Sequence, residues 1–209
     1  MRNFPNVLLD PQQSVVLIID HQPQMYFGLE SASRFIIENN VIGLAKAAKV
    51  FQVPCILSTV EASGFSGYMY SKLQDVYPDI TPIDRTTINA WEDANFKNAV
   101  TQTARKKVII AGLWTEACVA FPALCMQQEG YATHIAADAC GGATKAAHDM
   151  AIMRMVQAGI KPLTTMQIMF EWQRDWNNKD TYDGVMAIVK EHGGAYGLGV
   201  EYADTMVNV

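Results

Sequence analysis

Apolar residues follow two alternating patterns along the chain. The unbroken, β-branched run at residues 15–19 is typical of a strand that is covered on both faces of a sheet, and further strands are predicted at 53–57, 108–111, 131–137 and 161–164. Between these runs, apolar residues at helical spacing predict helices over residues 36–51, 96–104, 116–129 and 144–158. Gly130 and Gly159 follow the last two helices, as is common at helix ends. The alternation of strands and helices predicts a parallel sheet with helices on both faces.

The remaining segments complete the outline of an α/β fold. Ile83 and Ile88, on either side of Arg85, indicate a short sixth strand at the end of a loop-rich segment that begins near residue 61. With right-handed crossovers, we expect a three-layer α/β/α sandwich around a mostly parallel six-stranded sheet.

Neither a repeat nor a low-complexity linker divides the sequence, so we expect one domain over residues 1–209. Its core spans residues 14–165, and residues 166–209 form a C-terminal extension. The tail at 193–209 contains four glycines and little helical period, and we expect it to dock on a neighbouring subunit.

Charge and composition narrow the class of partner. The formal net charge of the 209 residues is −5 and the chain has no long basic run, so we expect neither nucleic acid nor an anionic membrane as partner. No apolar stretch approaches the roughly 20 residues that cross a bilayer, and residues 1–5 lack the apolar core of a signal peptide. The four cysteines include no CxxC pair, so we expect free thiols in a reducing compartment, the cytoplasm.

Reactive side chains follow two of the predicted strands. Asp20 comes directly after the first strand, and Cys118 follows the strand at 108–111 by a few residues. Because ligands bind at the carboxyl ends of strands in open parallel sheets, a thiol and a carboxylate are expected at one edge. This pair is a candidate nucleophile and base.

The position of Cys118 just inside a helix start favours reactivity. The helix dipole there would lower the pKa of the thiol, and backbone N–H groups without helical partners could face an oxyanion. Pro122 cannot donate a hydrogen bond to the carbonyl of Cys118, so the first turn is expected to be irregular. Two plainer interpretations stay open: Cys118 as a small buried apolar residue, and Asp20 as a cap of the following turn.

Two motifs resemble those of the isochorismatase-like cysteine hydrolases. The segment Val16–Gln22 is similar to the "DxQ" signature at the end of the first strand, and Ala111–Val119 is similar to the "GxxTxxCV" nucleophile segment. The resemblance runs from about residue 14 to 165 and implies a Rossmann-like hydrolase fold. Segments Thr115–Leu124, Ile88–Trp91 and Glu171–Trp176 most resemble the YcaC-like branch of this superfamily.

The resemblance implies a catalytic triad of cysteine, aspartate and lysine. On this sequence Cys118 is then the nucleophile, Asp20 the base, and Arg85 stands at the lysine position. An arginine stays charged and cannot shuttle a proton, so Arg85 is expected to orient Asp20 and to supply positive potential. The resemblance also implies a cis peptide between Leu113 and Trp114, with the N–H groups of Trp114 and Cys118 forming an oxyanion hole.

Further residues are candidates for the pocket. The side chains expected to contact substrate are Tyr26, Phe65, Asn89 and Trp91, with packing in the core or between subunits as the alternative for the aromatic residues. Cys125 is expected to be buried, whereas Cys140 ends a strand on the reactive edge. The four histidines form no ligand cluster, so we expect no metal and no other cofactor.

These residues indicate a hydrolase that cleaves the C–N bond of a small-molecule amide through a thioester. Hydrolysis of a vinyl ether, as in isochorismatases, is one alternative. A redox or stress scaffold with a reactive but idle Cys118 is another. Nucleotide binding is disfavoured because no glycine-rich phosphate loop follows a strand. We expect a homo-oligomer, either a tetramer or stacked tetramers, as the YcaC-like resemblance implies.

Overall fold

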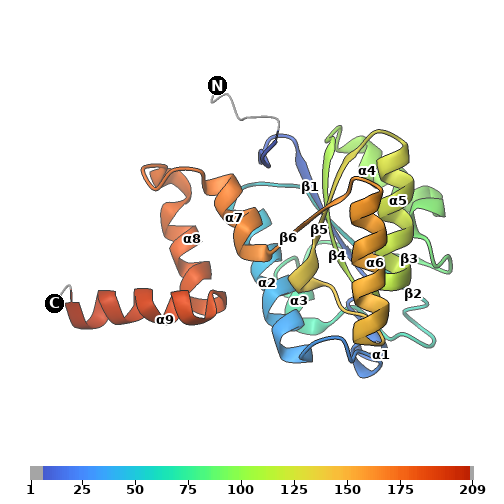
Figure 1. Ribbon diagram of the computed structural model, residues 1–209, viewed down its shortest axis with the longest axis horizontal. Helices are drawn as coiled ribbons and strands as arrows, with labels where there is room; N and C mark the ends of the chain where they lie inside the picture. The colour runs from blue at the N-terminus through green and yellow to red at the C-terminus, as the bar shows by residue number, and fades with distance from the viewer. Residues whose placement is uncertain (1–6, 208–209) are drawn as a thin grey trace.

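The computed structural model describes residues 7–207, so residues 1–6 and 208–209 of the expected domain lie outside the described part of the chain. A parallel six-stranded sheet forms the centre (Figure 1). Its strands are β1 (Ser14–Ile19), β2 (Cys55–Val60), β3 (Ile83–Arg85), β4 (Lys107–Gly112), β5 (Ala132–Ala136) and β6 (Lys161–Leu163). This confirms the expected sandwich around six strands.

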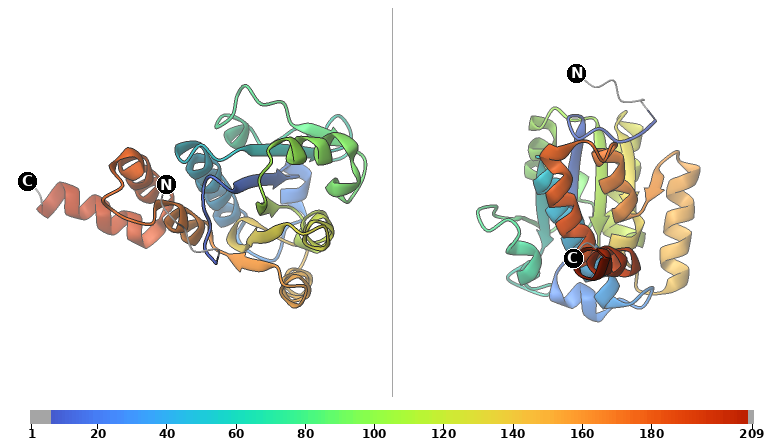
Figure 2. Two further views of the ribbon diagram at one scale, coloured as in Figure 1. Left: turned by 90° about the horizontal axis from the view of Figure 1, so that it is seen from above. Right: turned by 90° about the vertical axis from the view of Figure 1, so that its left-hand side faces the viewer.

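Helices cover both faces of the sheet. The helical segments, in chain order, are α1 (Pro23–Phe27), α2 (Arg34–Val50), α3 (Ser71–Gln74), η1 (Ala90–Glu92), α4 (Ala94–Gln102), η2 (Thr115–Val119), α5 (Ala120–Gln128), η3 (Ala137–Ala139), α6 (Lys145–Gln157), α7 (Thr165–Gln173), α8 (Lys179–His192), α9 (Gly194–Tyr202) and η4 (Ala203–Val207). Helices α4, α5 and α6 lie on one face, and α2 and α7, followed by α8, lie on the other (Figures 1 and 2).

Strand periodicity divides the core between the two faces. Val16 and Ile18 of β1 point toward α2, α7 and α8, whereas Val15, Leu17 and Ile19 point toward α4, α5 and α6. All six residues of β1 are buried, because a central parallel strand has an apolar layer on each side.

The strand order places the carboxyl ends of β1 and β4 at a switch point. The order is β3-β2-β1-β4-β5-β6, so the chain first moves outward from β1 and later returns to its other side. Ile19 is in register with Ser58 of β2 and with Gly112 of β4, and Val60 is in register with Arg85. The residues that follow these positions therefore share one edge of the sheet, where parallel sheets bind ligands.

Two sequence expectations differ from the structure. β2 begins at Cys55 rather than Val53, because the Val53 N–H closes the turn after α2 on the carbonyl of Ala48. The tail is helical rather than irregular, since α9 and η4 occupy residues 194–207. Two of its four glycines allow close packing: a Cβ at Gly193 or Gly197 would overlap the backbone carbonyl of Val189. Figures 1 and 2 show α9 extending away from the body.

Across the described residues, no helix is long and apolar enough to cross a membrane.

Candidate active site

Asp20 lies at the carboxyl end of β1 with its side chain fully buried. Its backbone is left-handed, with φ of 58°, a conformation that aspartate and asparagine tolerate better than most residues. The Asp20 N–H donates to the carbonyl of Ser58, and the Asp20 carbonyl accepts from the Gln22 N–H. These bonds direct the carboxylate into the edge of the sheet rather than into a solvent-exposed cap.

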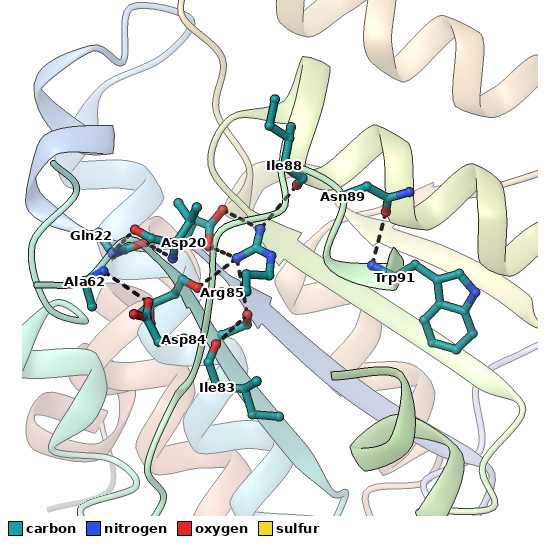
Figure 3. Close-up of polar contacts among 12 residues, drawn as sticks. Asp20, Gln22, Ala62, Ile83, Asp84, Arg85, Ile88, Asn89 and Trp91 are labelled. Carbon is teal, nitrogen blue, oxygen red and sulfur yellow. Dashed lines mark hydrogen bonds and ion pairs between the residues drawn. The ribbon is translucent and has the colours of Figure 1, made fainter. Parts of the chain in front are cut away.

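Arg85 holds Asp20 through two parallel hydrogen bonds (Figure 3). Nη1 donates to Oδ1 at 2.7 Å and Nη2 donates to Oδ2 at 2.9 Å. Nη1 also donates to the Thr59 carbonyl at 2.9 Å, which fixes the guanidinium plane. Paired forks of this kind are among the stronger hydrogen bonds in proteins. The predicted strand around Arg85 is β3, and its end delivers the guanidinium to Asp20.

Cys118 completes the cluster from the other side of β1. It lies in η2, a π-helical turn, so the irregular first turn expected before Pro122 is present. Its thiol lies close enough to Asp20 for the two groups to influence each other's pKa, and the residue is 8% exposed. The structure thus brings Asp20, Arg85 and Cys118 together from three separate parts of the chain.

The electrostatics of the thiol differ from the sequence expectation. Burial raises the pKa of Cys118 to about 12, and the adjacent Asp20 charge adds to the rise. Arg85 and the Trp114 N–H act in the opposite direction but do not prevail. The expected lowering by the helix dipole is therefore wrong, because burial and a neighbouring carboxylate outweigh the partial charge of a helix end. Burial also raises the pKa of Asp20, against the effect of Arg85.

Trp114 connects the nucleophile to the segment after Asp20. The Leu113–Trp114 peptide is cis, at the position that the family resemblance implied, and the Trp114 N–H donates toward the Cys118 sulfur. The indole Nε1 donates to the Met25 carbonyl at 2.9 Å. The ring lies so close to Gly28 that a Cβ there would come within 2.5 Å of it. The backbone beside the sulfur is thus anchored by the Trp114 side chain, which donates to a backbone carbonyl on α1.

The four predicted substrate residues lie in different settings. Tyr26 is buried, and its hydroxyl is 2.8 Å from Nδ1 of His21. Phe65 is exposed on the loop after β2.

Asn89 and Trp91 are buried in packing contacts. The Asn89 side chain accepts from the Trp91 N–H, as Figure 3 shows, and the Trp91 indole donates to Glu129. In the protomer these two residues brace η1 against α5.

The two other cysteines near α5 and β5 are not equivalent. Cys125 is half-buried rather than buried, and Asn89 Nδ2 lies 3.5 Å from its sulfur. Cys140 is buried beneath the edge, with its sulfur 3.8 Å from the Ile110 carbonyl, and burial raises the pKa of its thiol to about 12. Among residues 7–207, no group of three or more His, Cys, Asp or Glu side chains is arranged to hold a metal ion.

Gln22 is a site residue that the sequence reasoning did not single out beyond its motif. Its side-chain amide donates to the Val60 carbonyl at 3.0 Å and accepts from the Val60 N–H at 2.9 Å. The same amide donates to the Gly67 carbonyl. Gln22 therefore clamps the end of β2 and the following loop to the segment that carries Asp20.

Comparisons with known proteins agree with the fold and identify the family. The family model for the isochorismatase domain matches residues 14–167. The Escherichia coli protein described as a probable hydrolase, YcaC, is 35% identical over 189 residues, which is 90% of each chain.

Two solved structures are similar over almost the whole chain. YcaC from Pseudomonas aeruginosa, with hexane-2,5-diol and covalent acrylamide, is 34% identical with a TM-score of 0.91 and covers 97% of this chain and 100% of its own. The E. coli YcaC structure, an octameric hydrolase of unknown specificity, is 35% identical with a TM-score of 0.91 and covers 98% and 100%. With this family match and this identity, the chain belongs to the isochorismatase family of hydrolases.

Proposed function

We propose that this protein hydrolyses the C–N bond of a small-molecule amide through a thioester on Cys118. The observation that carries the proposal is the contact of a buried thiol with a carboxylate that a guanidinium holds by two hydrogen bonds. A nucleophile beside an oriented base is the arrangement that covalent acyl transfer requires. The covalent acrylamide in the P. aeruginosa relative shows that a group of that protein reacts covalently with a small electrophile. It supports a reactive nucleophile in the family, and not the cleavage of a C–N bond, because a nucleophile adds to the alkene of acrylamide.

The reaction starts from a thiol rather than a thiolate, because the pKa of Cys118 is raised to about 12. The Asp20 carboxylate takes the thiol proton as the sulfur attacks the amide carbon, and the carbonyl electron pair moves to oxygen. The N–H groups of Trp114 and Cys118 hold this oxyanion, a role in which one donor contributes about 3 kcal/mol in comparable sites.

The second half of the cycle returns the proton. The oxyanion collapses, the C–N bond breaks, and Asp20 gives its proton to the leaving nitrogen. Asp20 then takes a proton from water as the water oxygen attacks the thioester. The C–S bond breaks, Asp20 returns the proton to sulfur, and the acid product leaves.

Arg85 orients the base in this scheme and transfers no proton. Its guanidinium stays charged in proteins, and both Nη atoms already donate to Asp20. Tyr26, Phe65, Asn89 and Trp91 remain proposed pocket residues. We also propose that the chain assembles as a tetramer or stacked tetramers, in line with the octameric E. coli relative.

The test is turnover of a panel of small amides, followed by release of ammonia or amine. Wild type should turn over at least one amide, and an acid quench should trap a mass increase on Cys118. Cys118→Ala should abolish both signals while its circular dichroism stays native. Turnover that survives Cys118→Ala refutes the mechanism. Ready oxidation of Cys118 without turnover of any amide would favour the redox scaffold.

A further inference from the structure

Arg85, the cation beside Asp20 and Cys118, has no exposed side-chain surface that a substrate could contact. The Arg85 side chain is fully buried, and both of its Nη atoms donate to Asp20. Nη1 also donates to the Thr59 carbonyl, and Nη2 to the Ile88 carbonyl at 3.3 Å. Because this charge is already matched by a carboxylate, it cannot neutralise a second anion.

Two more carboxylates act on the same pair. Asp84 is adjacent to Arg85 and accepts from the Thr59 hydroxyl at 2.8 Å and from the Ala62 N–H at 3.1 Å, both uncharged donors (Figure 3). Asp93 accepts from the Phe96 N–H at the start of α4, and its charge acts on Arg85. Asp84 is exposed, so water screens its charge. The charges beside Cys118 are therefore those of the Asp20–Arg85 pair, and Asp93 adds one negative charge near Arg85.

Segments that follow the three strands nearest Asp20 and Arg85 carry exposed apolar side chains. Large hydrophobic residues are 59–74% exposed on the segments that follow β1, β2 and β3: Phe27, Phe65, Tyr68 and Ile88. The loop after β2 is tied to the segment after β1, since Gln24 donates to the Ser66 carbonyl and Tyr70 to the His21 carbonyl. Ile88 lies directly beside the guanidinium, and its carbonyl accepts from Nη2 (Figure 3).

We infer that the substrate of this site is an uncharged amide with an apolar substituent, and that a carboxylate near the scissile bond is rejected. This inference rests on the proposed function and names its substrate class. A carboxylate entering the site would lose water and meet the negative charges of Asp20 and Asp93, while the Arg85 charge is already paired with Asp20. It also disfavours the vinyl ether alternative, because isochorismate carries two carboxylates.

The first experiment compares iodoacetamide with iodoacetate, which differ in charge but share a leaving group. The rate of Cys118 alkylation by each is measured by intact mass and divided by the rate on the neutral thiol N-acetylcysteine amide. The normalised preference for iodoacetamide should be about tenfold at low ionic strength, and should shrink near 1 M salt because the Debye length falls to about 3 Å. A normalised ratio of one, or a preference for iodoacetate, overturns the inference.

Variants identify the source of the preference. Asp93→Asn should lower the iodoacetamide preference severalfold while keeping the helix cap, since asparagine caps as well as aspartate. Asp180→Asn, on α8 at the opposite face of the sheet, removes the same charge and should leave the ratio unchanged. Equal effects of the two changes would mean that net charge, not the local carboxylates, sets the preference, and would overturn the inference.

Two further measurements separate this inference from the proposed function. If Asp20→Asn turns over amides as fast as wild type, the proposed base is wrong, whatever the charge preference. Turnover of three amides of matched length then tests the substrate class directly. The kcat/KM for butyramide should be about tenfold higher than the kcat/KM for succinamate. The kcat/KM for β-alaninamide should not show the same decrease relative to butyramide. Succinamate turned over as well as butyramide would refute the substrate class and leave the cysteine mechanism standing.

Discussion

Replacing Arg85 with methionine would leave the Asp20 carboxylate buried without its cation. Both side chains are fully buried, so water cannot replace the two lost hydrogen bonds without opening the sheet edge. Removal of one partner from a buried ion pair typically costs about 3–5 kcal/mol in the free energy of unfolding. We therefore expect Arg85→Met to lower the stability at pH 7 by about that amount.

The pH dependence of this loss carries a definite sign. In wild type, burial raises the pKa of Asp20 and Arg85 opposes the rise, so the pKa increases further when Arg85 is removed. A carboxyl whose folded pKa exceeds the unfolded value of about 3.9 supports folding at low pH and loses that support as pH rises through the folded pKa. The stability gap between Arg85→Met and wild type should thus narrow between pH 7 and 5, by up to about 1.4 kcal/mol for each pH unit.

The assay is urea unfolding of both proteins at matched protomer concentration at several pH values. The control is Asp20→Asn with Arg85→Met, which removes both charges and keeps a residue that tolerates φ of 58°. This double variant should recover about 2 kcal/mol or more at pH 7 and show no narrowing at acid pH. A loss below about 1 kcal/mol for the single variant, or a gap that widens at pH 5, would refute the reasoning.

Three other outcomes follow from the site and the tail. Gly28→Ala forces the Trp114 ring to move and should lower kcat by on the order of a hundredfold. Gly199→Ala, where a Cβ would meet no other atom, should leave kcat unchanged, and equal kcat values for the two variants would disprove the anchor role of Trp114. Because burial raises the pKa of Asp20, kcat/KM should start to fall on the acid side at a pH above about 3.9. An inflection of the pH profile at or below that pH would contradict a raised pKa. Leu198→Asp, at an exposed apolar position of α9, should lower the particle mass in analytical ultracentrifugation; an unchanged mass would exclude this residue from the subunit contact.

The charges beside Cys118 influence which substrates this member of the family accepts. Membership in the isochorismatase family describes descent and fold, while substrate choice is set by the charges and side chains at the sheet edge. In this chain the charges of the buried Asp20–Arg85 pair balance each other, and Asp93 adds negative charge beside the pair. Membership in the family therefore identifies a hydrolase fold but does not determine the charge of the substrate.

Local patterns in the sequence were sufficient for the layers and for the position of the reactive edge. An unbroken apolar run before Asp20 and another before Gly112 identify central strands, because strands with helices on both faces need apolar residues at every position. Parallel strands in turn place their carboxyl ends together, which predicted a thiol and a carboxylate at one edge. Pro122 likewise predicted the irregular turn at Cys118, since proline lacks the N–H that the turn would need.

Tertiary structure alone decided what depends on residues far apart in the chain. Asp20 and Arg85 are 65 positions apart, and nothing in either local pattern shows that both guanidinium Nη atoms donate to that carboxylate. The direction of the Cys118 pKa shift was misjudged from sequence, because burial and the Asp20 charge exist only once β1, β3 and η2 pack together. The glycines of the tail suggested irregular chain, yet Gly193 and Gly197 pack against the backbone of α8. Periodicity is a local property and can be read from the sequence, whereas desolvation, charge pairing and close backbone contact arise from surroundings that only the folded chain supplies.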